Sequence, residues 1–317
     1  MSSTTKVMRK LCAQIQSGGS YEAGAMFAQP FTAETITQKY DPIEDDSITG
    51  EGFAAVPQQG PRHTEGAITQ NLEVIGCETI LEAAFGANSS GVFTLGSNVK
   101  KLSMCGLNAA NAIEYANVYV KRLRISGSSG GNMVMDYDVV GVTAQDRDVI
   151  GSYPSVTDAN DPITFHEAGG TGYFRIGDAT DALDSDDEEN IEDFNIEITT
   201  GFDSQYCNEG VSTLTPEFGM VPPTVSGSVK ISRHDADTFQ DFEDADTALQ
   251  AELYLYKSAT ENIKIQIPRF KITCDVTDED VARQEITMFV GRNGSGSNYK
   301  NSSMAFVSPV RVTVVNS

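Results

Sequence analysis

Apolar and polar residues alternate with a period of two along much of this chain. The clearest case is residues 117–126 (NVYVKRLRIS), in which two apolar pairs are separated by one extra residue. Such alternation is typical of a half-buried strand, and the extra residue predicts a bulge. A Gly/Ser turn at 127–131 leads to a second alternating run at 133–140. The pattern predicts a long β-hairpin.

The second half of the chain repeats this hairpin pattern. In residues 262–273 (NIKIQIPRFKIT), Pro268 stands where the first copy has its extra residue, which suits a bulge or an edge position. At a shift of 147, seven of nine positions agree in type between 118–126 and 265–273. Each copy is followed by a second strand that ends in Val-Gly.

A strand and a short helix precede each hairpin. In the first half they are expected at 66–75 and 77–85, with Gly86 as the helix C-cap. In the second half the strand, the helix and a further strand are expected at 225–232, 237–245 and 249–256. The order of elements predicts a mainly β chain with short helices that arose by tandem duplication.

The predicted duplication divides the chain into three parts. Residues 1–65 are expected to form an N-terminal arm and long loop, since 30–63 is rich in proline and lacks periodicity. The first repeated domain is expected at 66–150 and the second at 151–317. An acidic loop at 178–193 lies outside the repeat.

The charge of the chain excludes several classes of function. The net charge is −23, of which −18 falls in residues 151–317. So acidic a surface repels nucleic acids and anionic membranes. No apolar stretch approaches the ~20 residues that a membrane-spanning helix needs. The five scattered cysteines form no C-x-x-C pair, which favours isolated thiols over a zinc site or a disulfide framework.

The acidic loop contains the one weak candidate for a metal site. Asp184, Asp186 and Glu188 alternate as the carboxylates of a calcium loop do. However, Glu189 stands where such a loop needs glycine, and Asn195 where it needs glutamate. The charge block therefore favours a solvated loop.

No other pattern points to a metal, a cofactor or catalysis. His63, His166 and His234 are far apart and have no partner three or four residues away. The Gly/Ser turn at 127–131 lacks the lysine and the following helix of a phosphate loop, and no G-x-S-x-G motif occurs. We expect no enzymatic activity and no cofactor.

Four blocks of the chain resemble a known family. They are GAITQNLEVIGCETILEAAFG at 66–86, YVKRLRISGSSGGNMVMDYDVVG at 119–141, DPITFHE at 161–167, and the strand with Pro-Arg and its partner at 265–291. In order and spacing these blocks are similar to the major tail tube proteins of siphophages, the phages with long non-contractile tails.

The resemblance implies a structural virion protein with β-sandwich or barrel-type tube domains. Such domains build an inner β-barrel from their long hairpins, and the rings stack into a tail tube that is assembled in the host cytoplasm. Two tube domains in each chain imply a trimeric pseudo-sixfold ring, and a hexameric ring is the alternative. The implied partners are further copies of the chain, the tape measure protein and other tail proteins. Genomic DNA would pass through the lumen without specific binding.

Four basic residues lie in the two strands that are expected to form the pore wall. They are Arg122, Arg124, Arg269 and Lys271. Pairing with carboxylates between strands or between subunits is favoured over a direct role of these charges in the pore.

Two other classes of function remain open at this point. A β-sandwich adhesin or glycan-binding module fits the strand content, but sugar-binding platforms favour exposed tryptophan and the chain has none. A hydrolase could use paired carboxylates, but with 45 acidic residues their presence discriminates nothing.

Overall fold

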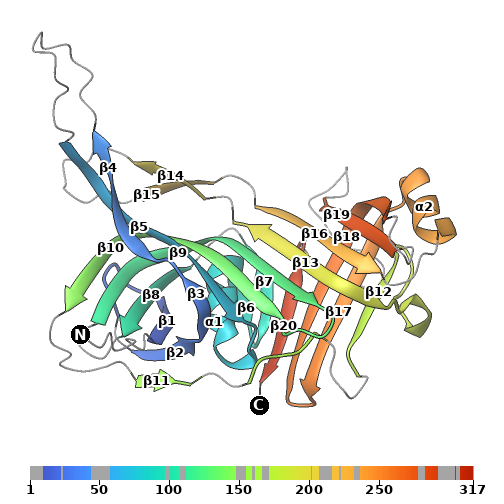
Figure 1. The fold of residues 1–317 in the computed structure, drawn as a ribbon, viewed down its shortest axis with the longest axis horizontal. Coiled ribbons are helices and arrows are strands. Elements are labelled where there is room, and N and C mark those ends of the chain that lie inside the picture. The colour runs from blue at the N-terminus through green and yellow to red at the C-terminus, as the bar shows by residue number, and fades with distance from the viewer. Residues whose placement is uncertain are drawn as a thin grey trace, which may run out of the picture.

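The computed structural model confirms a mainly β protein (Figure 1). It describes residues 10–22, 24–43, 58–96, 100–107, 112–147, 155–158, 161–165, 171–200, 202–206, 216–220, 223–231, 236–277, 283–291, 304 and 308–316. None of the helices in this part of the chain is long and apolar enough to cross a membrane.

Four strands pair side by side in the first half of the chain. The long strand β9 (Ala112–Ser128) pairs with β8 (Lys101–Leu107) and with β10 (Val134–Arg147). In turn, β10 pairs with β5 (Gln58–Asn71). All of these pairs are antiparallel.

Four strands of the second half pair in the same order. The long strand β18 (Glu261–Thr277) pairs with β17 (Leu249–Ser258) and with β19 (Arg283–Val290), and β19 pairs with β16 (Thr224–Ile231). The other edge of β16 carries β13 (Ile191–Thr199).

Shorter strands accompany the long ones in both halves. In the first, β3 (Phe31–Glu34) and β4 (Thr37–Ile43) pair with β5. In the second, β14 (Phe202–Tyr206) and β15 (Pro216–Met220) form a separate two-stranded sheet. The remaining strands are β1 (Lys10–Gln16), β2 (Ala25–Gln29), β6 (Gly86–Ser89), β7 (Val92–Leu95), β11 (Ser155–Thr157), β12 (Tyr173–Asp178) and β20 (Arg311–Asn316).

One apolar core connects the two halves. Alternating side chains of the long strands enter it, including Leu123 and Ile125 from β9 and Ile265 and Phe270 from β18. Helix α1 (Val74–Phe85) packs inside this core, and most of its side chains are buried. The period-2 patterns of the sequence are therefore explained by burial on one side of each strand.

The hairpin, bulge and helix predictions are confirmed. In β9, Val120 and Arg122 lie opposite consecutive residues of β10, so the residue between them is the extra one of a bulge. In β18, the register with β17 shifts between Ile267 and Phe270, around Pro268. Helix α1 ends at Gly86, whose φ of 80° is the left-handed C-cap conformation that glycine adopts readily. Helix α2 (Ala236–Asp244) occupies the second predicted position.

The arm and long loop expected over residues 1–65 stay a prediction, because residues 1–9, 23 and 44–57 lie outside the described residues. Within the described residues, β1 pairs with β8, β2 pairs with β1, and β3 and β4 pair with β5. Pro30 lies between β2 and β3, and Pro42 lies at a register shift of β4. Prolines at strand ends and irregularities are compatible with a sheet, so they do not indicate a loop here.

Two of the cysteines are not isolated as the sequence predicts. Cys12 in β1 lies directly opposite Cys105 in β8, and both buried residues are free thiols. The Cys12 thiol donates to the Cys105 carbonyl oxygen at 3.4 Å. The residues are 93 positions apart, so only the pairing of the strands brings them together.

Candidate assembly surface

A continuous run of eight antiparallel strands crosses both halves of the chain. Its order is β3, β5, β10, β9, β13, β16, β19 and β18. The junction between the halves is the pair β9–β13, in which residues 122–128 lie opposite 199–193. In Figure 1, β9 and β13 lie next to each other across the middle of the molecule.

The two faces of this run differ in chemistry. On the core face, Leu123 in β9 lies opposite Ile198 in β13, and both side chains are fully buried. The neighbouring positions alternate to the other face, where Arg122, Arg124 and Glu197 are half-buried. The run is thus a sheet with one apolar and one charged, polar face, as an antiparallel sheet with one covered side requires.

Arg122 connects three adjacent strands on the polar face. Its Nε lies 2.8 Å from Oδ2 of Asp138 in β10, and its Nη1 lies 3.3 Å from Oε2 of Glu197 in β13. The hydrogen bond that Arg122 donates to the Asp138 carboxylate is the largest cause that raises the pKa of Arg122. Because these side chains are about a third exposed, each pair stabilises the fold only modestly.

The other three basic residues from the sequence analysis are not gathered into one cluster. Arg124 donates from Nε to Oδ1 of Asn195 at 2.7 Å, again across the β9–β13 junction. Lys271 in β18 forms an ion pair with Asp246, just beyond α2. Arg269 is half-buried in β18. Arg122 and Arg124 therefore lie at the junction of the halves, and Lys271 lies at the outer end of the run.

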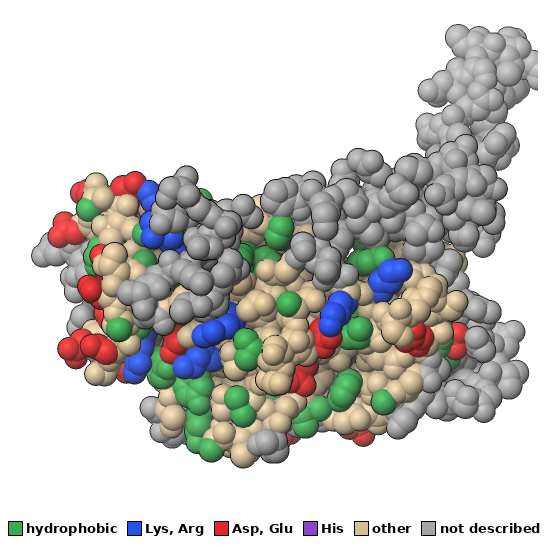
Figure 2. All heavy atoms as spheres, turned by 180° about the vertical axis from the view of Figure 1, so that it is seen from behind, with side chains coloured by type: hydrophobic (Ala, Val, Ile, Leu, Met, Phe, Trp, Pro, Cys, Tyr) green, Lys and Arg blue, Asp and Glu red, His purple; other side chains and the backbone are tan. Residues whose placement is uncertain are grey.

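Carboxylates of the acidic segment bind to nearby groups of the chain. Asp184 begins a short 3₁₀ helix, Ser185–Asp187, by accepting from the Asp186 N–H at 2.8 Å. Glu188 lies 2.6 Å from the guanidinium of Arg175. No group of three His, Cys, Asp or Glu side chains among the described residues is placed to hold a metal ion. Figure 2 shows acidic side chains gathered at the end of the molecule that carries α2 and this segment.

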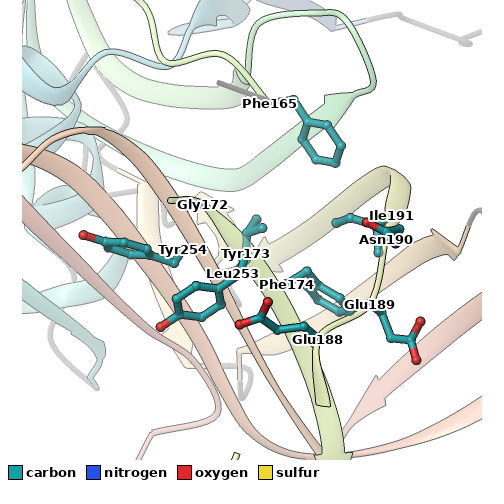
Figure 3. A pocket seen from close by; sticks show the side chains of 10 residues that line it. All are labelled: Phe165, Gly172, Tyr173, Phe174, Glu188, Glu189, Asn190, Ile191, Leu253 and Tyr254. Carbon is teal, nitrogen blue, oxygen red and sulfur yellow. The ribbon is translucent and has the colours of Figure 1, made fainter. Parts of the chain in front are cut away.

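A cavity of about 380 Å³ lies between β12, β17 and the acidic segment (Figure 3). The Tyr173 hydroxyl donates to Oε1 of Glu252 at 2.5 Å, and the Arg175 guanidinium lies 4.0 Å from the centre of the Tyr173 ring. Burial raises the pKa of Tyr173, and the bond to Glu252 raises it further. These groups form a satisfied hydrogen-bonded network, which serves packing rather than catalysis.

Glu73 is the most unusual buried acid in the described chain. It precedes α1 and forms a β-bridge with Pro162 from the segment between the halves. Its Oε2 is buried without a hydrogen-bond partner. Burial raises the pKa of Glu73 to about 7, although the charge of Lys257 opposes the shift.

Of the three histidines, His63 lies among the described residues. His63 is buried in β5, with Nε2 at 3.5 Å from Oε2 of Glu65. His166 and His234 lie outside the described residues.

Sequence reasoning missed two strands of the eight-strand run. The strand β13 begins within the acidic segment and was not predicted, although Ile196 and Ile198 alternate with polar residues as in the other strands. The strand β3 is only four residues long and follows Pro30, so it carries almost no periodic signal.

The comparisons agree with the fold and the polar, non-catalytic surface. A family model described as "Phage tail tube protein" matches residues 13–287 of the 317-residue chain. The chain has no match among the curated proteins. The family match supports neither a glycan-binding adhesin nor a hydrolase.

Proposed function

The chain belongs to the phage tail tube protein family, and from this premise we propose that each copy supplies two tube domains to the wall of a closed ring. Members of the family are structural, non-enzymatic components of the virion tail, and they assemble with themselves and with other tail proteins. The proposal concerns how this particular chain builds the tube.

The observation that carries the proposal is the β9–β13 junction. The four strands before it are β3, β5, β10 and β9, and the four after it are β13, β16, β19 and β18. In each set, the last two strands are the two arms of the long hairpin, and the first two precede the hairpin in the sequence. We take the two sets as the wall strands of a first tube domain, 66–150 preceded by β3, and of a second, 151–317. The junction then represents a contact between neighbouring tube domains that is built into one chain.

This arrangement favours a trimeric, pseudo-sixfold ring. Three copies that contribute eight strands each would close a barrel of about 24 strands, and barrels of 16–18 strands already leave an aqueous channel. A ring of six copies is the alternative if only one half of each chain lines the pore. Closure of the ring would also cover the edge strands, which are otherwise prone to uncontrolled association.

We assign the polar face of the eight-strand run to the lumen. Arg122 on this face is held by Asp138 and Glu197, so its charge is already neutralised. Paired cations offer little to DNA phosphates, because a phosphate contact would first have to break the existing pair. Genomic DNA would therefore pass without specific binding. The tape measure protein and other proteins of a long, non-contractile tail are the further partners that we propose.

The mass of a single ring tests this function. We expect purified protein to form rings or stacked tubes of uniform bore, visible by negative-stain electron microscopy. Native mass spectrometry of single rings should give three chains of 34.1 kDa each. Rings of six chains would reject the trimer but keep the tube, and a protein that stays monomeric at every salt and protein concentration would reject both.

A further inference from the structure

Both ends of the eight-strand run have an edge that no strand of the described residues covers. At one end, β3 pairs only with β5. At the other end, β17 lies along one edge of β18 as far as Phe270, which lies opposite Leu249. From Lys271 to Thr277 its only partner is β19. Open strand edges present unpaired N–H and C=O groups and favour the addition of another strand.

The β9–β13 junction shows how such an edge is covered within the chain. There, Glu197 lies opposite Arg124. The Thr200 N–H donates to the Lys121 oxygen at 3.0 Å, which marks residues 200 and 121 as a hydrogen-bonded pair. Such pairs alternate along an antiparallel ladder, so Glu197 and Arg124 form a non-hydrogen-bonded pair with closely spaced side chains.

The same positions can be followed through the strands of the second half. In the first half, the residues that lie opposite one another across the strands are Leu123, Tyr137, Ile68 and Glu34. In the second half, the equivalent residues are Phe270, Val290, Val225 and Ile198. The step from Val290 to Val225 continues by one residue the register in which Phe289 lies opposite Ser226. The edge of β18 therefore corresponds to the edge of β9, with Lys271 at the position of Arg124. The strand β3 corresponds to β13, with Ala33 at the position of Glu197.

We propose that residues 31–33 of β3 in one copy add as an antiparallel strand to the edge of β18 that begins at Lys271 in the next copy, with Ala33 opposite Lys271. This contact rests on the proposed function, because it joins the second tube domain of one chain to the first tube domain of its neighbour. The occupant of the edge is thus a second copy of this chain. Repeated three times, the contact closes the ring.

The first of the two edges is held in place because its strand continues along β5. After β3 the chain passes Gly66 of β5 at Thr35 and Ile36 and continues as β4 along the same edge of β5. A Cβ on residue 66 would come within 2.5 Å of the Ile36 Cα, so glycine permits this close approach. Phe31 packs against the core from its half-buried position. The outer edge of β3 is thereby fixed before any partner arrives.

The second edge is protected by acidic side chains in the free chain. Glu243 of α2 accepts a hydrogen bond from the Cys274 N–H at 2.9 Å, and Asp246 pairs with Lys271. Charged groups that shield an edge in this way limit uncontrolled strand addition. The Lys271–Asp246 pair has side chains that are 51% and 76% exposed, so an incoming strand displaces it at little cost.

Cysteine cross-linking of assembled tubes tests the pairing. We expect the double variant Ala33→Cys/Lys271→Cys to form an intersubunit disulfide under mild oxidation, because non-hydrogen-bonded pairs bring Cβ atoms close enough. A non-reducing gel should show a ladder of covalent products that ends at three chains. The matched control is Ala33→Cys/Asp275→Cys, in which the second position lies about 13 Å further along β18. The control should give at most a tenth of the product.

Hydrogen exchange of the wild-type tubes tests the same contact without any variant. Among residues 31–33 and 271–277, the amides that point to the open edges should exchange at least tenfold more slowly in tubes than in the unassembled chain. Tubes that form normally but show neither the disulfide nor this protection would overturn the β3–β18 contact and leave the proposed function intact. A wild-type chain that forms no rings at all would overturn both.

Discussion

The two long strands β9 and β18 have equivalent positions in the two halves but different surroundings. Both are 17 residues long and both belong to a long hairpin. One edge of β9 pairs with β10, and the other pairs with β13 over residues 122–128. In β18, residues 271–277 pair with β19 on one edge, and no strand of the described residues pairs with the other edge there. Under our proposal, the covered edge of β9 is a junction within the chain, and the open edge of β18 is the junction with a neighbouring copy.

The two helices show the same contrast. Helix α1 lies in the core, and its side chains are almost all apolar and buried. Helix α2 buries Phe239 and packs Phe242 against the core, but it also carries four acidic residues, of which Glu243 reaches the open edge of β18. The first helix therefore stabilises a completed domain, and the second also shields an edge that is still open.

The largest effect on the fold is expected at the internal junction. Ile196 in β13 is fully buried, so Ile196→Ala should lower the free energy of unfolding by about 2–4 kcal/mol. Its counterpart Phe31 in β3 is only half-buried, so Phe31→Ala should cost the monomer less, about 1–2 kcal/mol. In contrast, Phe31→Ala should impair assembly more strongly than its effect on the monomer suggests.

Urea unfolding of the unassembled chain and sedimentation of the tubes measure these two effects separately. If Phe31→Ala and Ile196→Ala changed monomer stability and assembly in the same proportion, the distinction between an internal and an intersubunit junction would fail.

A pH-dependent effect is expected where α1 meets the segment between the halves. The pKa of Glu73 is raised by burial to about 7, from an ordinary value of 4.5. The folded state then binds more protons than the unfolded state, so this residue reduces stability as the pH rises through this window. The stability advantage of Glu73→Gln over the wild type should grow by about 2 kcal/mol from pH 5 to pH 8.

Thermal or urea unfolding of both proteins at each pH measures this difference. A constant difference between the two proteins across the range would show that Glu73 does not titrate in the folded state as described.

A smaller effect is expected from Glu243, the acidic side chain of α2 that lies at the open edge of β18. Glu243→Gln keeps a hydrogen-bond acceptor for the Cys274 N–H but removes the charge. Monomer stability should change by less than about 1 kcal/mol, since the side chain is near the surface. Assembly should begin at a lower protein concentration, which light scattering against concentration would detect. An unchanged onset would show that the charge of Glu243 does not restrain association.

The smallest effect is expected from the polar face of the sheet. A double-mutant cycle of Arg122→Ala and Asp138→Ala should give a coupling energy of about 0.5 kcal/mol, because both side chains are about a third exposed. The coupling should weaken further at high salt. A coupling above about 2 kcal/mol would mean that this ion pair is a major element of the wall.

Much of the fold could be predicted from local patterns in the sequence. The alternation in 117–126 and 262–273, the extra residue near Lys121, the proline at 268 and the C-cap at Gly86 each reflect local geometry. Each of these signals depends only on residues that are neighbours in the sequence. The strands, the bulges and the helix end that they predict are confirmed.

The rest depends on contacts between distant parts of the chain. The pairing of β13 with β9 joins residues about 70 positions apart, and no local pattern specifies that register. The same holds for the partners of Arg122 and for the position of Cys12 opposite Cys105. The short strand β3 carries too few residues to show a period, and its role follows only from its equivalence to β13.

The central claim is that each chain supplies eight consecutive strands to one closed wall. Cryo-electron microscopy of assembled tubes, at a resolution that traces the strands, tests it most directly. We expect three chains in each ring, with β3 of one chain beside β18 of the next and Arg122 facing the lumen. A ring of six chains in which only one half of each reaches the lumen, or one in which the outer edge of β3 stays uncovered, would contradict it.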